Sequence, residues 1–258
     1  MDAHIKSASS KVPEVMLMFW VAKIAATTLG ETGGDAVSMS MHLGYLAATA
    51  IFAVLFVLAA GAQIKAKRFH PWLYWATIIA TTTVGTTLAD FADRSLGIGY
   101  AGGASALFAL LMASLAIWYR TLGTVSAGSV ATPRSEGFYW VTIMFSQTLG
   151  TALGDWTAGT HNLGYGGGAA VFAALLAGVV VAYYRTNISR TALFWAAFIL
   201  TRPLGAVVGD FLDKPVDAGG MALSRFTASA VLLAFIACCL WLFPQRPASN
   251  IHRPDRTV

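Results

Sequence analysis

Four aspartates mark an internal repeat that covers most of the 258 residues of the chain. Successive aspartates lie 55, 65 and 55 residues apart, and each follows a tryptophan by fifteen positions and a glycine by five. Several landmarks recurring at fixed spacing are the signature of a repeat architecture. The chain is therefore expected to fold as four copies of one unit. The aspartates are Asp35, Asp90, Asp155 and Asp210, and the tryptophans are Trp20, Trp75, Trp140 and Trp195.

Each copy contains two apolar runs, and the composition indicates that a membrane surrounds them. Hydrophobic residues make up 57% of the chain and charged residues 11%, against roughly 45 to 50% and about 25% in soluble domains. A helix that spans a bilayer needs about 20 mostly apolar residues, so eight spans need roughly 160. We expect an all-α integral membrane protein with eight transmembrane helices in a single membrane domain. The expected repeats are residues 14–65, 71–120, 137–185 and 192–243, with polar tails at 1–13 and 244–258.

Basic residues indicate how the repeats are oriented. Twelve of the 17 Lys and Arg residues lie in the tails and in three alternate loops, which the positive-inside rule assigns to the cytoplasm. Because each repeat contains two crossings, all four repeats run in the same direction and are related by an axis along the membrane normal. The formal charge of +5 thus reports a multi-pass topology with both termini cytoplasmic, and not a nucleic-acid partner. The twelve are Lys6, Lys11, Lys65, Lys67, Arg68, Arg120, Arg134, Arg185, Arg190, Arg246, Arg253 and Arg256.

The repeated tryptophans stand near the cytoplasmic start of the first helix of each repeat. Amphipathic aromatic rings are enriched at the level of the lipid headgroups. We therefore expect Trp20, Trp75, Trp140 and Trp195 to anchor these helices at the membrane interface. The lipid bilayer is accordingly the main partner that the sequence predicts.

Polar residues recur at every fourth position along the first helix of each repeat, which puts them on one helix face. The first repeat has Lys23, Thr27, Glu31 and Asp35. Such stripes are costly against lipid, so they should face one another or a shared watery cavity, with the aspartates in a ring. The other stripes are Thr82, Thr86, Asp90 and Arg94; Gln147, Thr151 and Asp155; and Arg202, Ala206, Asp210 and Lys214.

The stripes hold more acids than bases. Five carboxylates within the expected spans, Glu31 and the four aspartates, face only Lys23 and Arg202. Buried carboxylates without enough partners take up protons or bind a cation, and hard cations prefer oxygen ligands. Glycines directly before three aspartates, Gly34, Gly154 and Gly209, are expected to loosen the helices there and to offer carbonyl oxygens.

These features predict a cation site or pathway. Asp35, Asp90, Asp155 and Asp210 are the candidate metal ligands, lined by Glu31, Thr86, Thr151 and Gln147, with Lys23 and Arg202 tuning the charge. A small cation, and a divalent one in particular, is the candidate ligand, and no other cofactor is required.

Two functions remain open at this point. One is a transporter or channel for a small cation, with Glu31 as the proton-linked carboxylate. The other is a non-transporting scaffold or sensor whose polar stripes only hold the bundle together. An enzyme is not expected, because no histidine is spaced with a serine or cysteine as a nucleophile and its base would be. A homo-oligomer also stays open.

The repeated motif resembles a bacterial family of four-repeat membrane proteins, known as membrane-anchored proteins and as a repeat of unknown function. The resemblance rests on the tryptophan, glycine and aspartate at fixed spacing, and on Tyr45, Tyr100 and Tyr165 after a glycine at the start of the second helix. It covers about residues 14–243. It implies two transmembrane helices per repeat and a location in the bacterial inner (plasma) membrane, and it implies no particular activity.

A second, weaker similarity concerns the cation. The segment Glu31–Asp35, which reads ETGGD, is similar to the E-x-G-D signature of proton-coupled manganese or calcium exchangers. One residue is inserted here, the Lys/Arg and Ser/Thr that follow that signature are absent, and the repeats of that family are inverted. The similarity favours a divalent ion over a monovalent one.

Overall fold

The computed structural model describes residues 9–159 and 163–248. These residues are mainly helical, and a single antiparallel bridge between Pro13 and Pro247 is their one β contact. The all-α class is thereby confirmed, while the outer parts of both predicted tails lie outside the described residues. The helices are α1 (Leu17–Asp35), α2 (Gly44–Lys65), α3 (Pro71–Asp90), α4 (Tyr100–Leu122), α5 (Pro133–Gly159), α6 (Gly164–Arg185), α7 (Arg190–Asp213) and α8 (Arg225–Leu242).

Helix ends follow the predicted repeats to within four residues. The largest difference is at α5, which begins at Pro133 instead of residue 137. Its start is fixed by a reciprocal cap: the Ser135 amide donates to Thr132 Oγ1 at 3.2 Å, and the Thr132 amide donates to Ser135 Oγ at 3.0 Å. Such a capping box, with Pro at the first helical position, is a strong helix start.

Five helices, α2, α4, α6, α7 and α8, are long and apolar enough to cross a membrane. Most of the surface of α2, α4, α6 and α8 is exposed and apolar; Leu46, Val57 and Leu58, for example, are 62 to 65% exposed. A side-chain pattern of this kind is typical of helices in contact with lipid. The chain is therefore a membrane protein.

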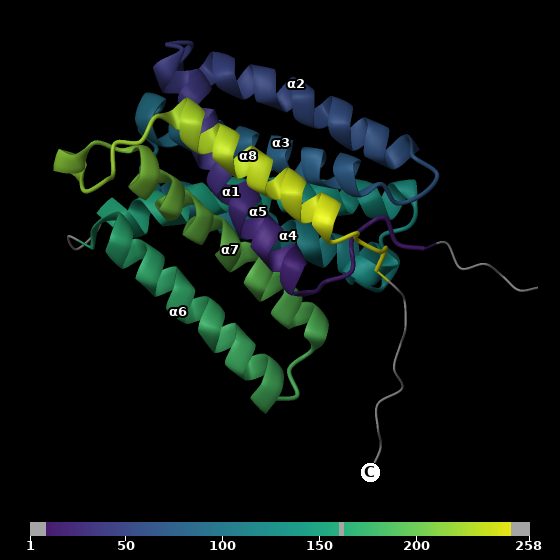
Figure 1. The fold of residues 1–258 in the computed structure, drawn as a ribbon. Coiled ribbons are helices and arrows are strands. Elements are labelled where there is room, and N and C mark those ends of the chain that lie inside the picture. Colours follow the sequence, from purple (N-terminus) through teal and green to yellow (C-terminus); the bar gives the residue numbers. More distant parts are fainter. Residues whose placement is uncertain (1–8, 160–162, 249–258) are drawn as a thin grey trace, which may run out of the picture.

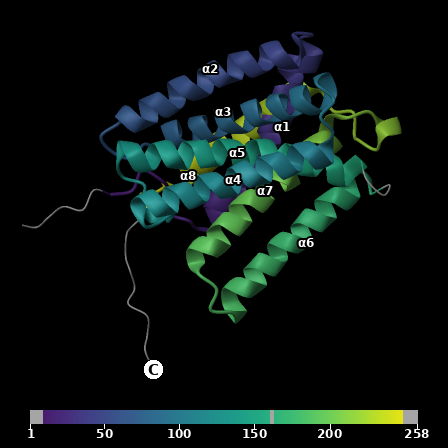
Figure 2. The same cartoon turned by 180° about the vertical axis from the view of Figure 1, so that it is seen from behind.

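The four odd helices form a closed ring at the centre of the molecule, in which α1 packs against α3, α3 against α5, α5 against α7, and α7 against α1. The even helices cover the ring from outside (Figure 1). Each even helix packs mainly on the odd helix of the next repeat: α2 on α3, α4 on α5, α6 on α7, and α8 back on α1. Figure 2, seen from behind, shows α4 on the side opposite α8. The repeats are thus interlocked in a cycle.

Glycines set the spacing of the ring, because the repeated glycine of each odd helix meets a side chain of the next. A Cβ at Gly30 would lie 2.3 Å from Thr82 Cγ2, and a Cβ at Gly150 would lie 2.2 Å from Arg202 Cγ. Gly85 meets Gln147 and Gly205 meets Thr27 in the same way. Close helix approach over small residues is the usual basis of packing in lipid.

Aromatic rings fill one end of the ring, here called the aromatic end. Contacts run around it from helix to helix: Phe19 to Trp75 at 5.6 Å between ring centroids, and Tyr139 to Trp195 at 6.3 Å. Trp75, Trp140 and Trp195 are at most 4% exposed. This differs from the interface anchors that we expected at these positions, because the rings of neighbouring repeats bury one another; Trp20 is only partly buried.

The inner part of each predicted tail packs against the aromatic end. Ser10 Oγ donates to the Ala127 carbonyl at 2.7 Å, and Lys11 Nζ lies 2.6 Å from Glu136 Oε1. The Ala248 amide donates to the Val12 carbonyl at 2.8 Å. Two segments that the sequence marks only as polar tails therefore form a clasp, defined as residues 9–14 and 244–248, in which residues 10–13 and Ala248 are buried.

Candidate functional site

The four polar stripes meet inside the ring and divide its interior into levels about 6 Å apart, since equivalent positions of the repeats share a level. All sixteen side chains in four successive levels are at most 8% exposed. The last level, formed by the repeated aspartates, defines the acidic end. Starting nearest the aromatic end, the levels are Lys23, Ile78, Ile143 and Phe198; Thr27, Thr82, Gln147 and Arg202; Glu31, Thr86, Thr151 and Ala206; and Asp35, Asp90, Asp155 and Asp210.

Arg94 joins two of the aspartates at the acidic end. Its Nε donates to Asp90 Oδ1 at 2.7 Å, and its Nη2 lies 3.7 Å from Asp155 Oδ2. The Arg94 side chain is 39% exposed, whereas both carboxylates are buried. This cation therefore covers the Asp90 and Asp155 side of the aspartate level.

Lys214 joins the other two aspartates. Its Nζ forms an ion pair with Asp35 and lies 2.9 Å from Asp210 Oδ1 and 3.7 Å from Asp213 Oδ1. Arg225, at the start of α8, adds contacts of 3.1 Å to Asp213 Oδ2 and 3.8 Å to Asp35 Oδ2. The ammonium of Lys214 thus occupies a position surrounded by carboxylate oxygens.

These contacts correct the excess of negative charge that the sequence predicts for the interior of the ring. Five acids were set against two bases, but Asp213 joins the acids, and Arg94, Lys214 and Arg225 join the bases. Six acids then face five bases among the described residues. Asp90 and Arg94, and likewise Asp210 and Lys214, are four residues apart, a spacing that favours an ion pair on a helix. This spacing is the sequence feature that indicates the pairing of Arg94 and Lys214. Asp213 and Arg225 have no such signal, because only the fold brings α7, α8 and α1 together there.

Both bridging cations lie just beyond the ends of their helices and keep their charge. Burial opposes the charge of Lys214, but Asp210, Asp35 and Asp213 outweigh burial and raise the pKa of Lys214 above its usual range. Burial likewise opposes the charge of Arg94, and Asp90 and Asp155 raise its pKa. Both shifts favour the charged form of these groups.

One level deeper, Glu31 is held by Arg202 from α7. Arg202 Nη2 donates to Glu31 Oε2 at 3.1 Å, to Thr86 Oγ1 at 2.6 Å, and to Thr151 Oγ1. Four predicted site residues therefore form one buried network. Lys23 lies elsewhere: its Nζ is 3.3 Å from Thr201 Oγ1 and 3.8 Å from the centroid of the Phe198 ring.

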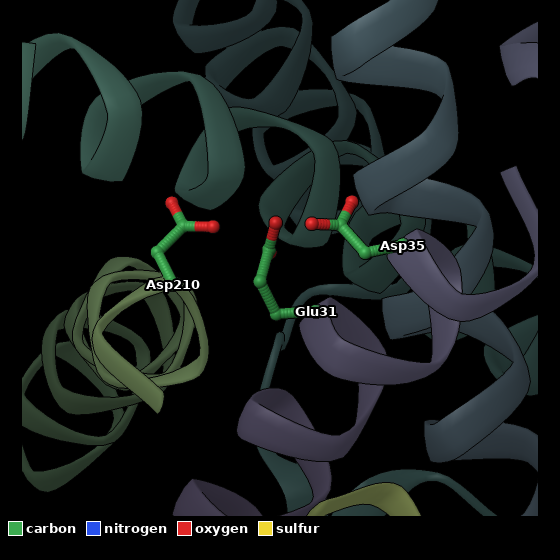
Figure 3. A group of neighbouring side chains, drawn as sticks. All are labelled: Glu31, Asp35 and Asp210. Atoms are coloured by element: carbon green, nitrogen blue, oxygen red, sulfur yellow. The ribbon is translucent and has the colours of Figure 1, made fainter. Parts of the chain in front are cut away.

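Three carboxylates converge between α1 and α7. Glu31, Asp35 and Asp210 each offer an oxygen within 4.8 Å of the other two, and Figure 3 shows Glu31 between the two aspartates. All three are buried, and Asp35 Oδ1 has no hydrogen-bond partner among the described residues. Carboxylate oxygens at this spacing fit a hard cation such as Mn²⁺, Ca²⁺ or Mg²⁺. This group, here called the carboxylate triad, contains two of the four predicted aspartates, while Asp90 and Asp155 lie with Arg94.

The glycines next to the aspartates pack helices together. α1, α5 and α7 continue through Gly34, Gly154 and Gly209. A Cβ at Gly209 would lie 2.6 Å from Glu31 Cβ, and one at Gly34 would lie 3.1 Å from Thr86 Cγ2. The helices are therefore not interrupted at these glycines, which let neighbouring helices approach at the level of Glu31. In the first repeat the helix changes to a π-helix just after Asp35, at Ala36–Ser40.

Comparison with known proteins identifies the repeat. The profile of a family described as Repeat of Unknown Function (DUF347) matches residues 18–69, 73–124, 138–189 and 193–246. This confirms the predicted resemblance to a four-repeat family. No curated protein and no solved structure matches the chain.

Proposed function

The chain belongs to this family of four tandem repeats, and we propose that it moves a small cation across the membrane by way of the carboxylate triad. The observation that carries the proposal is the buried meeting of Glu31, Asp35 and Asp210 within 4.8 Å. Three carboxylates are rarely held together away from water unless protons or cations compensate them. A divalent cation coupled to protons fits a site with this charge.

Lys214 supplies a mechanism for release. Its ammonium contacts Asp35 and Asp210, so it stands where an incoming cation would bind. A cation that enters displaces the ammonium, and the returning ammonium expels the cation. Because Lys214 keeps its charge, the exchange needs no proton from the lysine itself. Glu31, one level deeper and paired with Arg202, is the carboxylate that takes up the coupled proton.

The membrane arrangement belongs to the same proposal. All eight helices cross the bilayer, with α1, α3 and α5 shielded from lipid by their neighbours. The membrane is the bacterial inner membrane. The basic loops and both termini are cytoplasmic, so the aromatic end faces the cytoplasm and the acidic end faces outward. The packed aromatic rings then close the cytoplasmic side of the pathway in this conformation.

A second candidate is a non-transporting scaffold. It is favoured by the ion pairs, since each of the four repeated aspartates contacts Arg94 or Lys214. Charged groups paired so completely can hold helices in register without any ligand. The two candidates differ in what neutral replacement of a triad carboxylate does to ion flux.

Flux in proteoliposomes separates them. Purified protein is reconstituted with a fluorescent metal indicator inside, and uptake of Mn²⁺, Ca²⁺ and Na⁺ is followed with and without a pH gradient. Asp35→Asn and Glu31→Gln keep the side-chain shape but remove the charge. We expect each to reduce uptake of the transported ion at least tenfold, about 1.4 kcal/mol.

Asp217→Asn is the matched control, because Asp217 is an exposed acid in the turn after α7. It should transport like the unmodified protein. Equal uptake by empty liposomes and by the unmodified protein, for every ion tested, would rule out transport. Unchanged uptake in folded Asp35→Asn and Glu31→Gln would show that the protein transports the ion without using the carboxylate triad.

A further inference from the structure

The level between Lys23 and Glu31 contains polar groups that the fold leaves without partners. Both side-chain atoms of Gln147, the Nε and Nη1 atoms of Arg202, and Thr82 Oγ1 make no hydrogen bond to any described residue. All three side chains are 0% exposed. They come from three different helices of the ring, α3, α5 and α7, at one level of the repeat.

Buried polar groups of this kind are normally satisfied by a bound ion or by ordered water. A buried polar group without a partner costs about 1 to 3 kcal/mol, and native proteins satisfy nearly all of them. The unpartnered groups here are mainly donors, since Arg202 offers N–H groups at two atoms and Gln147 offers an amide. A donor-rich site buried from water favours an anion over a cation.

The charge at this level also favours an anion. Arg202 is the cation of this level, and Glu31, one level away, is the carboxylate paired with it. Lys23 bonds to the Phe198 carbonyl at 3.5 Å and to Thr201 Oγ1 at 3.3 Å, both of them neutral acceptors. The Nε and Nη1 atoms of Arg202, which do not contact Glu31, therefore present positive charge that a monovalent anion would balance.

The space limits the size of that anion. A Cβ at Gly85 would lie 3.0 Å from the Gln147 backbone carbon, and one at Gly150 would lie 2.2 Å from Arg202 Cγ. Helices this close leave room for a single-atom ion better than for a polyatomic one such as phosphate. We propose that Arg202, Gln147 and Thr82 bind one halide ion, chloride in the cell, at the centre of the bundle. This site lies next to the carboxylate triad, because Arg202 also pairs with Glu31, but the proposal does not rest on cation transport.

Thermal unfolding in detergent tests the proposal. The melting temperature is measured at constant ionic strength while gluconate, which is too large for the site, is replaced by chloride or bromide. We expect a saturable rise on the order of 5 °C at a hundredfold excess over the dissociation constant. Equal melting temperatures in gluconate and in both halides would overturn the proposal.

Replacement of Gln147 gives a sharper result. Gln147→Glu puts a fixed negative charge where the halide binds. In gluconate, the melting temperature of this variant should equal that of the unmodified protein in saturating chloride. Halide should not change it further. Gln147→Met removes the donor and should weaken the halide effect at least fivefold. Thr148→Val is the control, because the Thr148 hydroxyl bonds to its own helix at the Met144 carbonyl. A halide effect in Gln147→Glu as large as in the unmodified protein would contradict the assignment.

Diffraction from crystals grown in bromide locates the ion directly. The proposal predicts an anomalous peak within hydrogen-bond distance of Arg202 Nε or Nη1 and of the Gln147 amide. Ordered water at that position without an anomalous peak, in crystals that show bromide elsewhere, would also overturn it.

Discussion

Among single residues, Lys214 should have the largest effect on cation binding at the acidic end. Its ammonium contacts Asp35, Asp210 and Asp213, which makes it a cation that the chain itself supplies. A tethered cation competes with any free cation for the same oxygens. The strength of that competition should set the affinity of the carboxylate triad.

Lys214→Met tests the competition. Without the ammonium, the triad oxygens are free, so affinity for Mn²⁺ measured by isothermal titration should rise by roughly tenfold or more, about 1.4 kcal/mol. Lys67→Met, an exposed lysine in the loop after α2, is the control and should leave the affinity unchanged. A weaker affinity in Lys214→Met would show that the lysine supports binding instead of competing with it.

Single glycines control the spacing of the ring. Gly205→Ala would bring a Cβ to 2.1 Å from Thr27 Oγ1 and 2.9 Å from the Thr27 backbone carbon. Because backbone cannot move aside easily, we expect a loss of about 1 to 3 kcal/mol in the free energy of unfolding. Gly178→Ala has open space around its Cβ and should be neutral or stabilising. Denaturant unfolding in detergent, followed by tryptophan fluorescence, compares the two.

At the scale of elements, the helices were predictable and the clasp was not. Apolar runs and polar stripes of period four mark α1 to α8, because lipid and the bundle interior impose opposite chemistry on the two faces of a helix. The segments 9–14 and 244–248 have a polar composition, and only the fold shows that they pack against the aromatic end, with residues 10–13 and Ala248 buried. Their partners lie far away in the sequence: Lys11 bonds to the carbonyls of Gln63 and Ile64 as well as to Glu136.

The clasp should contribute to stability through this ion pair. Lys11→Met leaves Glu136 buried without its partner, so we expect a loss of about 3 kcal/mol. Lys11→Met combined with Glu136→Gln removes both charges and should recover part of that loss. A double-mutant cycle of unfolding free energies measures the coupling; a coupling of zero would mean that the pair contributes nothing.

At the scale of the whole molecule, the repeats form a cycle, since α8 packs on α1 and so joins the fourth repeat to the first. The sequence predicts the number of units and their common direction. It does not predict that each even helix packs on the next unit, because all four apolar even helices suit lipid and protein equally well. The sequence also predicts a ring of four equivalent aspartates, because each repeat contributes one. In the structure Arg94 contacts Asp90 and Asp155, and Lys214 contacts Asp35 and Asp210, so the four aspartates form two pairs.

Cross-linking tests the closure of the cycle. Thr32 Oγ1 of α1 and Ser229 Oγ of α8 lie 2.8 Å apart. In a background without Cys238 and Cys239, Thr32→Cys with Ser229→Cys should form a disulfide within one chain on mild oxidation. Thr32→Cys with Thr227→Cys should not, because Thr227 is exposed on a different face of α8. Cross-linking only between chains would show that α8 belongs to a neighbouring copy.

If the carboxylate triad binds the cation that the protein moves, Mn²⁺ should occupy it in crystals. Anomalous diffraction at the manganese edge, from crystals of Lys214→Met grown with Mn²⁺, locates the ion. We predict a peak coordinated by oxygens of Glu31, Asp35 and Asp210. Manganese bound only at exposed acids such as Asp217, with none between the three carboxylates, would contradict it.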